Sequence, residues 1–283
     1  MPTVVVPLDG SEFSERALRP GAALAARSGR EAARGRLVLV TCAASDGSVL
    51  ERRLRDRADL FASIVDVQVR VLEEDPVGGI LQTVAEDADA LLCMTTHGRG
   101  GVRNALLGSV SEQVVCDATG PIVLVGPKCT TTPLPGERSH VVVCSDGSSF
   151  GDAVLPVAIR WATQLGLGLW LVTVIGPDEA VALPGERPGH RELRDAQERL
   201  TRLAAGIPPE VGSPQTTVLY GLPAPRTIVG HAHRISAALI AMATHGRTGL
   251  LRTALGSVTA DVVRHSPCPV LIVRPPVQGP VDR

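Results

Sequence analysis

Two glycine-rich segments, each followed at the same distance by a Gly-Ser pair, have the composition of a phosphate-binding site. The segment GRGG at residues 98–101 precedes Gly108-Ser109, and GRTG at residues 246–249 precedes Gly256-Ser257, with nine residues between Gly98 and Gly108 and between Gly246 and Gly256. Glycine lets the backbone turn with a positive φ and lets an amide approach an anion without a Cβ in the way. If each Gly-Ser pair begins a helix, the free N–H groups and the helix dipole there favour phosphate.

The same segments carry further groups that suit this ligand. The serine hydroxyls add a hydrogen-bond donor, and Arg99 or Arg247 can offset phosphate charge. The alternative is an ordinary glycine-rich turn between a strand and a helix, with the serine as a helix cap. One copy alone is compatible with both interpretations. The identical spacing in two copies favours phosphate binding.

A second pair of polar segments, Asp9-Gly10-Ser11 and Asp146-Gly147-Ser148, follows two apolar runs that resemble strands. A carboxylate in this place can accept hydrogen bonds from a ribose or from the amino group of adenine. The alternative is an Asx-turn or a helix cap, which is the favoured interpretation for either segment taken alone.

Other candidate chemistry is weaker. His97 and His245 recur between the halves and could be general bases, but a histidine that bonds the loop backbone is favoured. His231 and His233 lack a third metal ligand at a suitable spacing, and no serine lies in a GxSxG motif. We therefore predict no catalytic residue and no metal site.

Composition excludes several classes of function. Lys128 is the only lysine and lies outside any GxxxxGK[ST] context, so P-loop ATPases and protein kinases are excluded. The net charge is −1 and aromatic residues make up 2%, which argues against a nucleic-acid partner. No apolar run approaches the ~18 residues that a membrane span needs, and the N-terminus resembles no signal peptide. We expect a cytoplasmic protein with reduced, mostly structural cysteines.

The polar segments belong to an internal repeat. Residues 4–11 reappear at 141–148, a displacement of 137, and residues 94–99 reappear at 242–247, a displacement of 148. The growth in displacement indicates an insertion of eleven residues, placed in the Pro- and Gly-rich stretch 177–189. We expect one domain at residues 1–129, a linker at 130–138, a second domain at 139–276 and a C-terminal tail at 277–283.

Each half alternates short apolar strands with helices, as in a parallel sheet covered on both faces. In the first half the pattern predicts strands at residues 4–8, 37–40, 67–72, 90–95 and 122–125. It predicts helices at 11–26 (bent at Pro20-Gly21), 48–65, 79–86 and 109–118. In the second half, the repeat of residues 4–8 begins at Val141, and the later strands are predicted at 170–174, 216–220, 238–243 and 270–273. Ligands are expected at the carboxyl ends of the strands.

Taken together, these motifs resemble the universal stress protein family in its tandem two-domain form, from Thr3 to about Pro275. The family's nucleotide-binding motif is G-x2-G-x9-G-[ST]. Its first glycine is replaced here by Thr95 and by Ala243, and the β-branched Thr95 would crowd a pocket more than alanine does. The resemblance implies two doubly wound α/β domains, each with a five-stranded parallel sheet of order 3-2-1-4-5. It also implies that the fifth strands pair within the chain as a pseudo-dimer.

The resemblance further implies an adenine-nucleotide site in each half. The residues expected in the first site are Pro7, Asp9, Cys42, Met94, Thr95, His97, Gly98, Arg99, Gly101, Gly108, Ser109, Val110 and Ser111. Those expected in the second site are Ser145, Asp146, Val174, Met242, Ala243, His245, Gly246, Arg247, Gly249, Gly256, Ser257, Val258 and Thr259.

The predicted function is regulatory or stress-responsive binding of up to two ATP molecules, accompanied by Mg²⁺, without fast catalysis. One alternative is a slow ATPase or phosphotransferase on the same scaffold. Another is a protein-interaction module whose nucleotide pockets have been lost. A further possible partner is a second copy of the whole chain, which would form a homodimer.

Overall fold

The computed structural model describes residues 3–29, 34–43, 47–73, 75–97, 107–131, 139–176, 190–244 and 255–274. The predicted insertion, most of the linker and the C-terminal tail lie outside these residues. The strands are β1 (Thr3–Pro7), β2 (Arg36–Cys42), β3 (Asp66–Leu72), β4 (Leu91–Thr95), β5 (Ile122–Val125), β6 (His140–Cys144), β7 (Gly168–Ile175), β8 (Gln215–Tyr220), β9 (Leu239–Ala243) and β10 (Val270–Val273).

Helices alternate with these strands in chain order. They are α1 (Glu12–Glu15), α2 (Leu18–Ser28), α3 (Ser48–Asp59), α4 (Pro76–Ala85), α5 (Ser109–Asp117), α6 (Ser149–Asp152), α7 (Val154–Leu165), α8 (His190–Ala205), the short 3₁₀ helix η2 (Pro209–Val211), α9 (Ala224–Arg234) and α10 (Ser257–His265). No helix of the described segments is long and apolar enough to cross a membrane.

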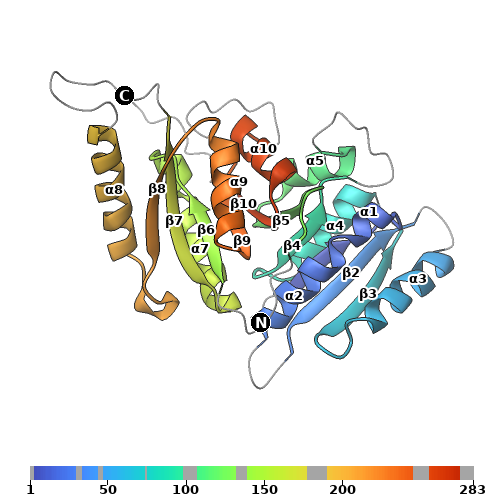
Figure 1. The fold of residues 1–283 in the computed structure, drawn as a ribbon. Coiled ribbons are helices and arrows are strands. Elements are labelled where there is room, and N and C mark those ends of the chain that lie inside the picture. The colour runs from blue at the N-terminus through green and yellow to red at the C-terminus, as the bar shows by residue number, and fades with distance from the viewer. Residues whose placement is uncertain are drawn as a thin grey trace, which may run out of the picture.

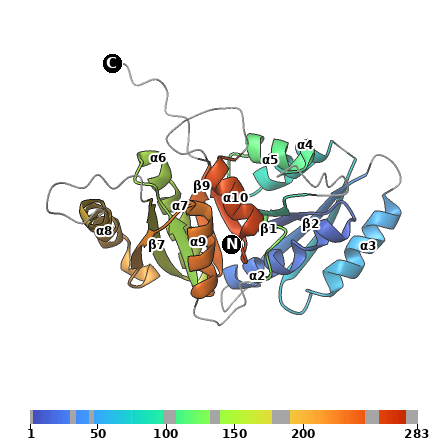
Figure 2. The same cartoon turned by 45° about the horizontal axis from the view of Figure 1, so that its top comes forward.

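The ten strands found in the described residues form one sheet, in the order β3-β2-β1-β4-β5-β10-β9-β6-β7-β8. Each half has the order 3-2-1-4-5 with parallel neighbours, as expected from the resemblance. The halves meet where β5 and β10 pair antiparallel, with Leu124 opposite Val270. Figure 1 shows β3 with α3 at one end of the molecule, and Figure 1 and Figure 2 both show α8 at the other. Because β5 is paired on both sides, it has no edge left for a second chain.

The two faces of the sheet carry two separate cores. Val4 and Val6 of β1 face one core with α2, α3, α7 and α8, whereas Val5 faces the other with α4, α5, α9 and α10. This alternation follows from the period of two residues along a strand. Each core contains residues of both halves, so the two repeats pack together and are not independent domains.

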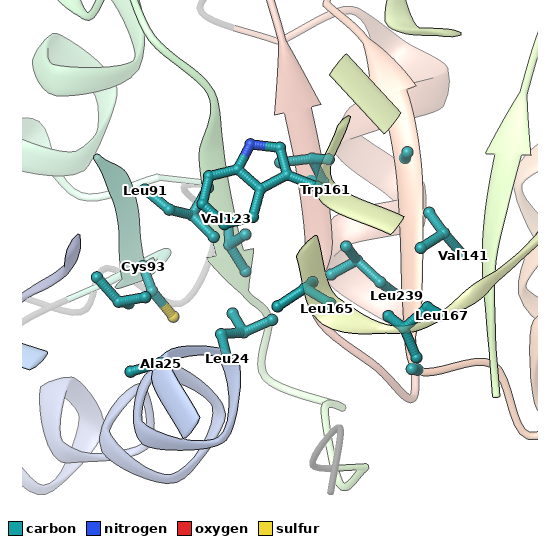
Figure 3. Packing of buried hydrophobic residues seen from close by; sticks show 14 of the residues in the cluster. Leu24, Ala25, Leu91, Cys93, Val123, Val141, Trp161, Leu165, Leu167 and Leu239 are labelled. Atoms are coloured by element: carbon teal, nitrogen blue, oxygen red, sulfur yellow. The ribbon is translucent and has the colours of Figure 1, made fainter. Parts of the chain in front are cut away.

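Helices α2 and α7 join the halves on one face of the sheet. Figure 3 shows Leu24 of α2 gathered with Trp161 and Leu165 of α7 in one cluster of buried side chains. Arg27 donates from Nε to the Leu165 carbonyl at 2.7 Å and from Nη2 to the Gly166 carbonyl at 3.2 Å. An arginine of the first half therefore caps the C-terminal carbonyls of a helix in the second half.

The first helix breaks one turn earlier than expected. The sequence predicts a bend at Pro20-Gly21, but α1 ends at Glu15 and α2 begins at Leu18. Proline has no N–H and its ring clashes with the carbonyl four residues before it. The disruption at Pro20 therefore falls on Arg16. The second half repeats the break between α6 and α7, where Pro156 stands in the first turn of α7.

Two other helix boundaries differ from the predicted ones. Helix α3 ends at Asp59, six residues before the predicted end, because the chain turns there to bury Val65 and to begin β3 at Asp66. Helix α4 begins at Pro76, three residues earlier than predicted. Asp75 caps it by accepting a hydrogen bond from the Gly78 amide at 3.1 Å, and proline is favoured at the first helical position.

Two histidines stack against Trp170 in the second half. Its ring lies edge-to-face with His140 at 5.3 Å and with His231 at 5.1 Å between ring centroids. Burial lowers the pKa of both histidines below the ordinary 6.5, and Arg234, whose Nη2 lies 3.0 Å from Nδ1 of His231, lowers that of His231 further. Just below pH 6.5, both rings are therefore still neutral in the folded protein, whereas the same two histidines are already protonated in most unfolded chains.

We expect the free energy of unfolding to decrease as the pH falls below 6.5, because the unfolded state then binds more protons than the folded state. Above the unfolded pKa these two groups contribute no pH dependence. Urea unfolding followed by tryptophan fluorescence measures the effect. His231→Phe keeps an aromatic ring against Trp170 and should flatten the decrease. An equally steep decrease in that variant would contradict the assignment to His231.

Candidate functional site

In each half, the middle strand of the sheet brings the predicted site residues to one edge. Strand β1 lies between β2 and β4, so the segments after Pro7, Cys42 and Thr95 meet at the carboxyl end of the sheet. Strand β6 lies in the same way between β7 and β9. Because β5 and β10 are antiparallel, the strands of the two halves run in opposite directions. The carboxyl ends of the strands in one half therefore lie at the opposite end of the strands from those in the other half.

The N-termini of α5 and α10 are the predicted anion-binding groups, and the structure confirms that Gly108-Ser109 and Gly256-Ser257 begin helices. Gly108 and Gly256 are the N-cap residues, and no described side chain caps either helix. The helices α1, α4 and α6 are capped by Ser11, Asp75 and Ser148 instead. The first-turn amides of α5 and α10 thus lack the side-chain acceptor that these three helix starts have, and the starts of α2, α3, α7 and α9 lack one as well.

Backbone conformation does not require glycine at these two caps. Gly108 has φ −71° and ψ 161°, and Gly256 has φ −63° and ψ 157°, which any residue adopts. The sequence suggested two reasons for glycine, a positive φ and the close approach of an amide to an anion. The first reason does not apply at Gly108 and Gly256. What glycine provides is the absence of a side chain beside the helix amides.

Hydrogen bonds tie the start of α5 to the end of β4. The Gly108 amide donates to the Thr96 carbonyl at 2.8 Å, and Ser111 Oγ donates to the Thr95 carbonyl at 3.1 Å. In the second half Thr259 Oγ1 donates to the Ala243 carbonyl at 3.2 Å. Ser111 and Thr259, both predicted site residues, are buried, and their hydroxyls are used in these hydrogen bonds.

Ser109 and Ser257, by contrast, are exposed at the helix starts, where their hydroxyls can meet a ligand. Val258 beside Ser257 is also exposed, and Val110 is partly so. Met94 and Met242 are buried at the ends of β4 and β9.

The two Asp-Gly-Ser segments form the turns that were the alternative interpretation from the sequence. Asp9 Oδ1 accepts from the Ser11 amide at 2.9 Å and from Ser11 Oγ at 2.6 Å. Asp146 Oδ1 accepts from the Ser148 amide at 3.0 Å and from Ser148 Oγ at 2.5 Å. Gly10 and Gly147, with φ of 79° and 85°, need to be glycine for this turn. A nucleotide contact by these carboxylates stays a prediction.

The end of β4 carries a side-chain cluster that the sequence analysis missed in part. Thr95 Oγ1 donates to the His97 carbonyl at 2.8 Å, and Thr96 Oγ1 lies 3.0 Å from His97 Nδ1. Phe13 of α1 packs edge-to-face on the His97 ring at 5.9 Å. The recurrence of Phe13 as Phe150, 137 residues later, is the sequence signal that could have identified it.

Several predicted site residues cannot be placed. Gly98, Arg99, Gly101, His245, Gly246, Arg247 and Gly249 lie outside the described residues. Cys42 and Val174 lie half-buried at the ends of β2 and β7. Over the described ranges, no group of three or more His, Cys, Asp or Glu side chains could hold a metal ion.

Ser145 has a different environment from the one expected of a ligand-binding residue. Its side chain is buried, and its hydroxyl donates to Asp152 Oδ1 and accepts from Nη1 of Arg199 in α8 at 3.0 Å. Arg199 was not among the residues predicted from the sequence. It lies 53 residues beyond Asp146 in the chain, and only the packing of α8 brings it to this edge.

Comparisons with known proteins agree on one family. The model of the universal stress protein family matches this chain twice, at residues 1–126 and 137–274. A universal stress protein of Mycobacterium tuberculosis is 31% identical over 210 residues, which are 70% of this chain and 64% of that protein. The chain thus matches less than two thirds of that relative's length. A universal stress protein of Methanocaldococcus jannaschii is 33% identical over 142 residues, which are 48% of this chain and 82% of that protein.

Among solved structures, a universal stress protein of Archaeoglobus fulgidus superposes with a TM-score of 0.65 at 22% identity, covering 96% of both chains. This likeness shows the fold. The two matched segments show two family units in tandem, whereas the domain limits at 1–129 and 139–276 stay a prediction.

Proposed function

The chain belongs to the universal stress protein family, and from this premise we propose that each of its halves binds one ATP molecule, so that the chain holds up to two. Binding serves regulation and not rapid turnover. The support comes from the chemistry available at the carboxyl edge of each half-sheet.

The observation that carries the proposal is the pair of glycine-capped helix starts. The first-turn amides of α5 and α10 have no side-chain cap among the described residues, while Ser109 and Ser257 expose hydroxyls beside them. An anion at this place receives hydrogen bonds and is favoured by the helix dipole. The same arrangement occurs in both repeats, at the edge where ligands of open α/β sheets bind.

The remaining groups suit the nucleoside. Asp9 and Asp146 would bind the ribose or adenine. Cys42 and Val174, half-buried at the ends of β2 and β7, offer apolar surface to the base, whereas Met94 and Met242 are buried and expose little of theirs. Mg²⁺ would be held mainly by the phosphate oxygens and water, because no group of three or more His, Cys, Asp or Glu side chains among the described residues could hold it alone.

Slow chemistry is expected because the sequence lacks a lysine at either loop. Amides, hydroxyls and arginines can hold a triphosphate without activating a water for attack. Any hydrolysis should therefore stay below roughly 1 s⁻¹, the lower end of ordinary enzyme turnover.

Nucleotide content and calorimetry test the proposal together. The purified protein is denatured and the released nucleotide is quantified, and protein stripped of nucleotide is then titrated with ATP in the presence of Mg²⁺. We expect ATP in the released fraction and up to two sites per chain. No released nucleotide together with no heat of binding at millimolar ATP would refute the proposal, and fast turnover would favour the enzyme alternative.

A further inference from the structure

A polar cluster lies directly beside the Asp146 turn in the second half. Its members are Ser145 at the end of β6, Asp152 of α6, Thr173 of β7 and Arg199 of α8, and we call it the Arg199 cluster. Arg199 Nη1 donates to Asp152 Oδ1 at 3.0 Å and to Ser145 Oγ at 3.0 Å, and Nη2 donates to Thr173 Oγ1 at 2.8 Å. The guanidinium therefore connects four elements through one planar group.

The Arg199 cluster holds both neighbours of Asp146. Thr173 Oγ1 donates to the Ser145 carbonyl at 2.9 Å, and the Gly147 amide donates to Ser145 Oγ at 3.2 Å. The Ser145 hydroxyl also donates to Asp152 and accepts from Arg199, so its hydrogen-bonding capacity is used on both sides. The residues before and after Asp146 are thus fixed by bonds that Arg199 organises.

Helix α6 leaves space for the Asp146 carboxylate itself. A Cβ on Gly151 would lie 2.3 Å from Asp146 Oδ1 and 3.2 Å from the Asp146 amide nitrogen. The carboxylate therefore packs against the backbone of α6, the helix that carries Asp152. Movement of α6 would move the Asp146 side chain with it.

The first half lacks this arrangement. Leu8, which is buried, stands where the second half has Ser145, and Ser14 stands where it has Gly151. The Asp9 amide donates to Ser14 Oγ at 3.3 Å, a bond within the turn itself. Glu15, in the place of Asp152, pairs with two arginines of α3, but the apolar Leu8 side chain offers them no hydrogen bond.

We infer that Arg199 is a positioning residue of the second nucleotide site, which it orders through Ser145 so that Asp146 is held in the conformation that receives the nucleotide. This inference rests on the proposed function. Preorganised groups bind more tightly because they lose less freedom on binding. The second site should accordingly bind ATP more tightly than the first, which has Leu8 in place of Ser145.

The test uses the full chain with the first site disabled by Gly108→Asp, so that calorimetry reports the second site alone. Arg199→Met keeps an unbranched apolar stem but loses the guanidinium group and its hydrogen bonds, and it should raise the Kd for ATP about tenfold or more. Arg199→Lys should not restore affinity, because one ammonium group cannot reach Ser145, Asp152 and Thr173 in the same fork.

A double-mutant cycle separates positioning from general loss of structure. Ser145→Ala should raise the Kd to a similar extent, and the double variant should be no weaker than the single ones, because both changes interrupt the same connection. Urea unfolding of each variant confirms that the binding experiments use folded protein. Should Arg199→Met not fold, Ser145→Ala alone still carries the test.

The matched control is in the first half. Arg53→Met with Arg57→Met, made in a Gly256→Asp background, removes the corresponding arginines and should change the first-site Kd less than twofold. An unchanged Kd in both Arg199→Met and Ser145→Ala, in a parent that binds one ATP per chain, would refute this inference alone. If the wild-type chain and the parent both bind no ATP, the proposed function fails and the inference fails with it.

Discussion

Gly256→Asp is expected to abolish ATP binding at the second site, and Gly108→Asp together with Gly256→Asp is expected to abolish it in the whole chain. The substitution places a carboxylate at the helix start, where it accepts the first-turn hydrogen bonds that phosphate would otherwise receive. It also sets a negative charge against the phosphates. Two like charges ~4 Å apart repel by ~4 kcal/mol near a protein surface, so affinity should fall at least a hundredfold.

The same substitution should leave the fold intact. Gly256 has φ −63°, so aspartate adopts this conformation without strain, and an aspartate N-cap is worth a few tenths of a kcal/mol more than glycine. Loss of binding with an unchanged or slightly raised free energy of unfolding would separate a site effect from damage. Calorimetric stoichiometry falling from two to one and then to none is the measurement.

Gly256→Asn is the matched control for charge. Asparagine caps the helix as aspartate does but carries no charge, so it should weaken ATP binding less than aspartate. ATP binding by Gly256→Asp with wild-type affinity would contradict the assignment of the phosphates to the start of α10.

Leu24→Ala is expected to destabilise the entire protein by about 2–5 kcal/mol, the cost of a cavity left by a fully buried leucine. Leu24 belongs to the first half but packs in the same cluster as Trp161 and Leu165 of the second (Figure 3). Because the two cores and the sheet are continuous across the β5–β10 pairing, we expect the halves to unfold together.

The tryptophans make this prediction measurable. Both of them, Trp161 and Trp170, are in the second half. A lowered urea midpoint of their fluorescence in Leu24→Ala therefore reports that the first half supports the second. Val49→Ala on the exposed surface of α3 is the control and should change the free energy of unfolding by less than about 0.5 kcal/mol. A fluorescence transition unmoved by Leu24→Ala would mean that the halves unfold independently.

Features that depend on neighbouring residues were predictable from the sequence. The positions of the described strands follow from runs of buried Val, Leu and Ile, and the helix starts at Gly108 and Gly256 follow from the repeated motif. The predicted helix boundaries were wrong where a proline or a capping residue had a stronger local effect than the apolar pattern. The effect of Pro20 fell one turn earlier, and the Asp75-Pro76 cap extended α4 toward its N-terminus.

The sequence by itself determined that the chain consists of two α/β repeats with paired polar segments, because strand periodicity, turn residues and motif spacing are local properties. The resemblance implied that the fifth strands pair within the chain, and the β5–β10 pairing confirms it. Only the tertiary structure decided that both cores contain residues of the two repeats, and that Arg199 reaches Ser145 from helix α8. Such contacts join residues tens of positions apart. Their existence depends on how whole elements pack, and no local pattern encodes that.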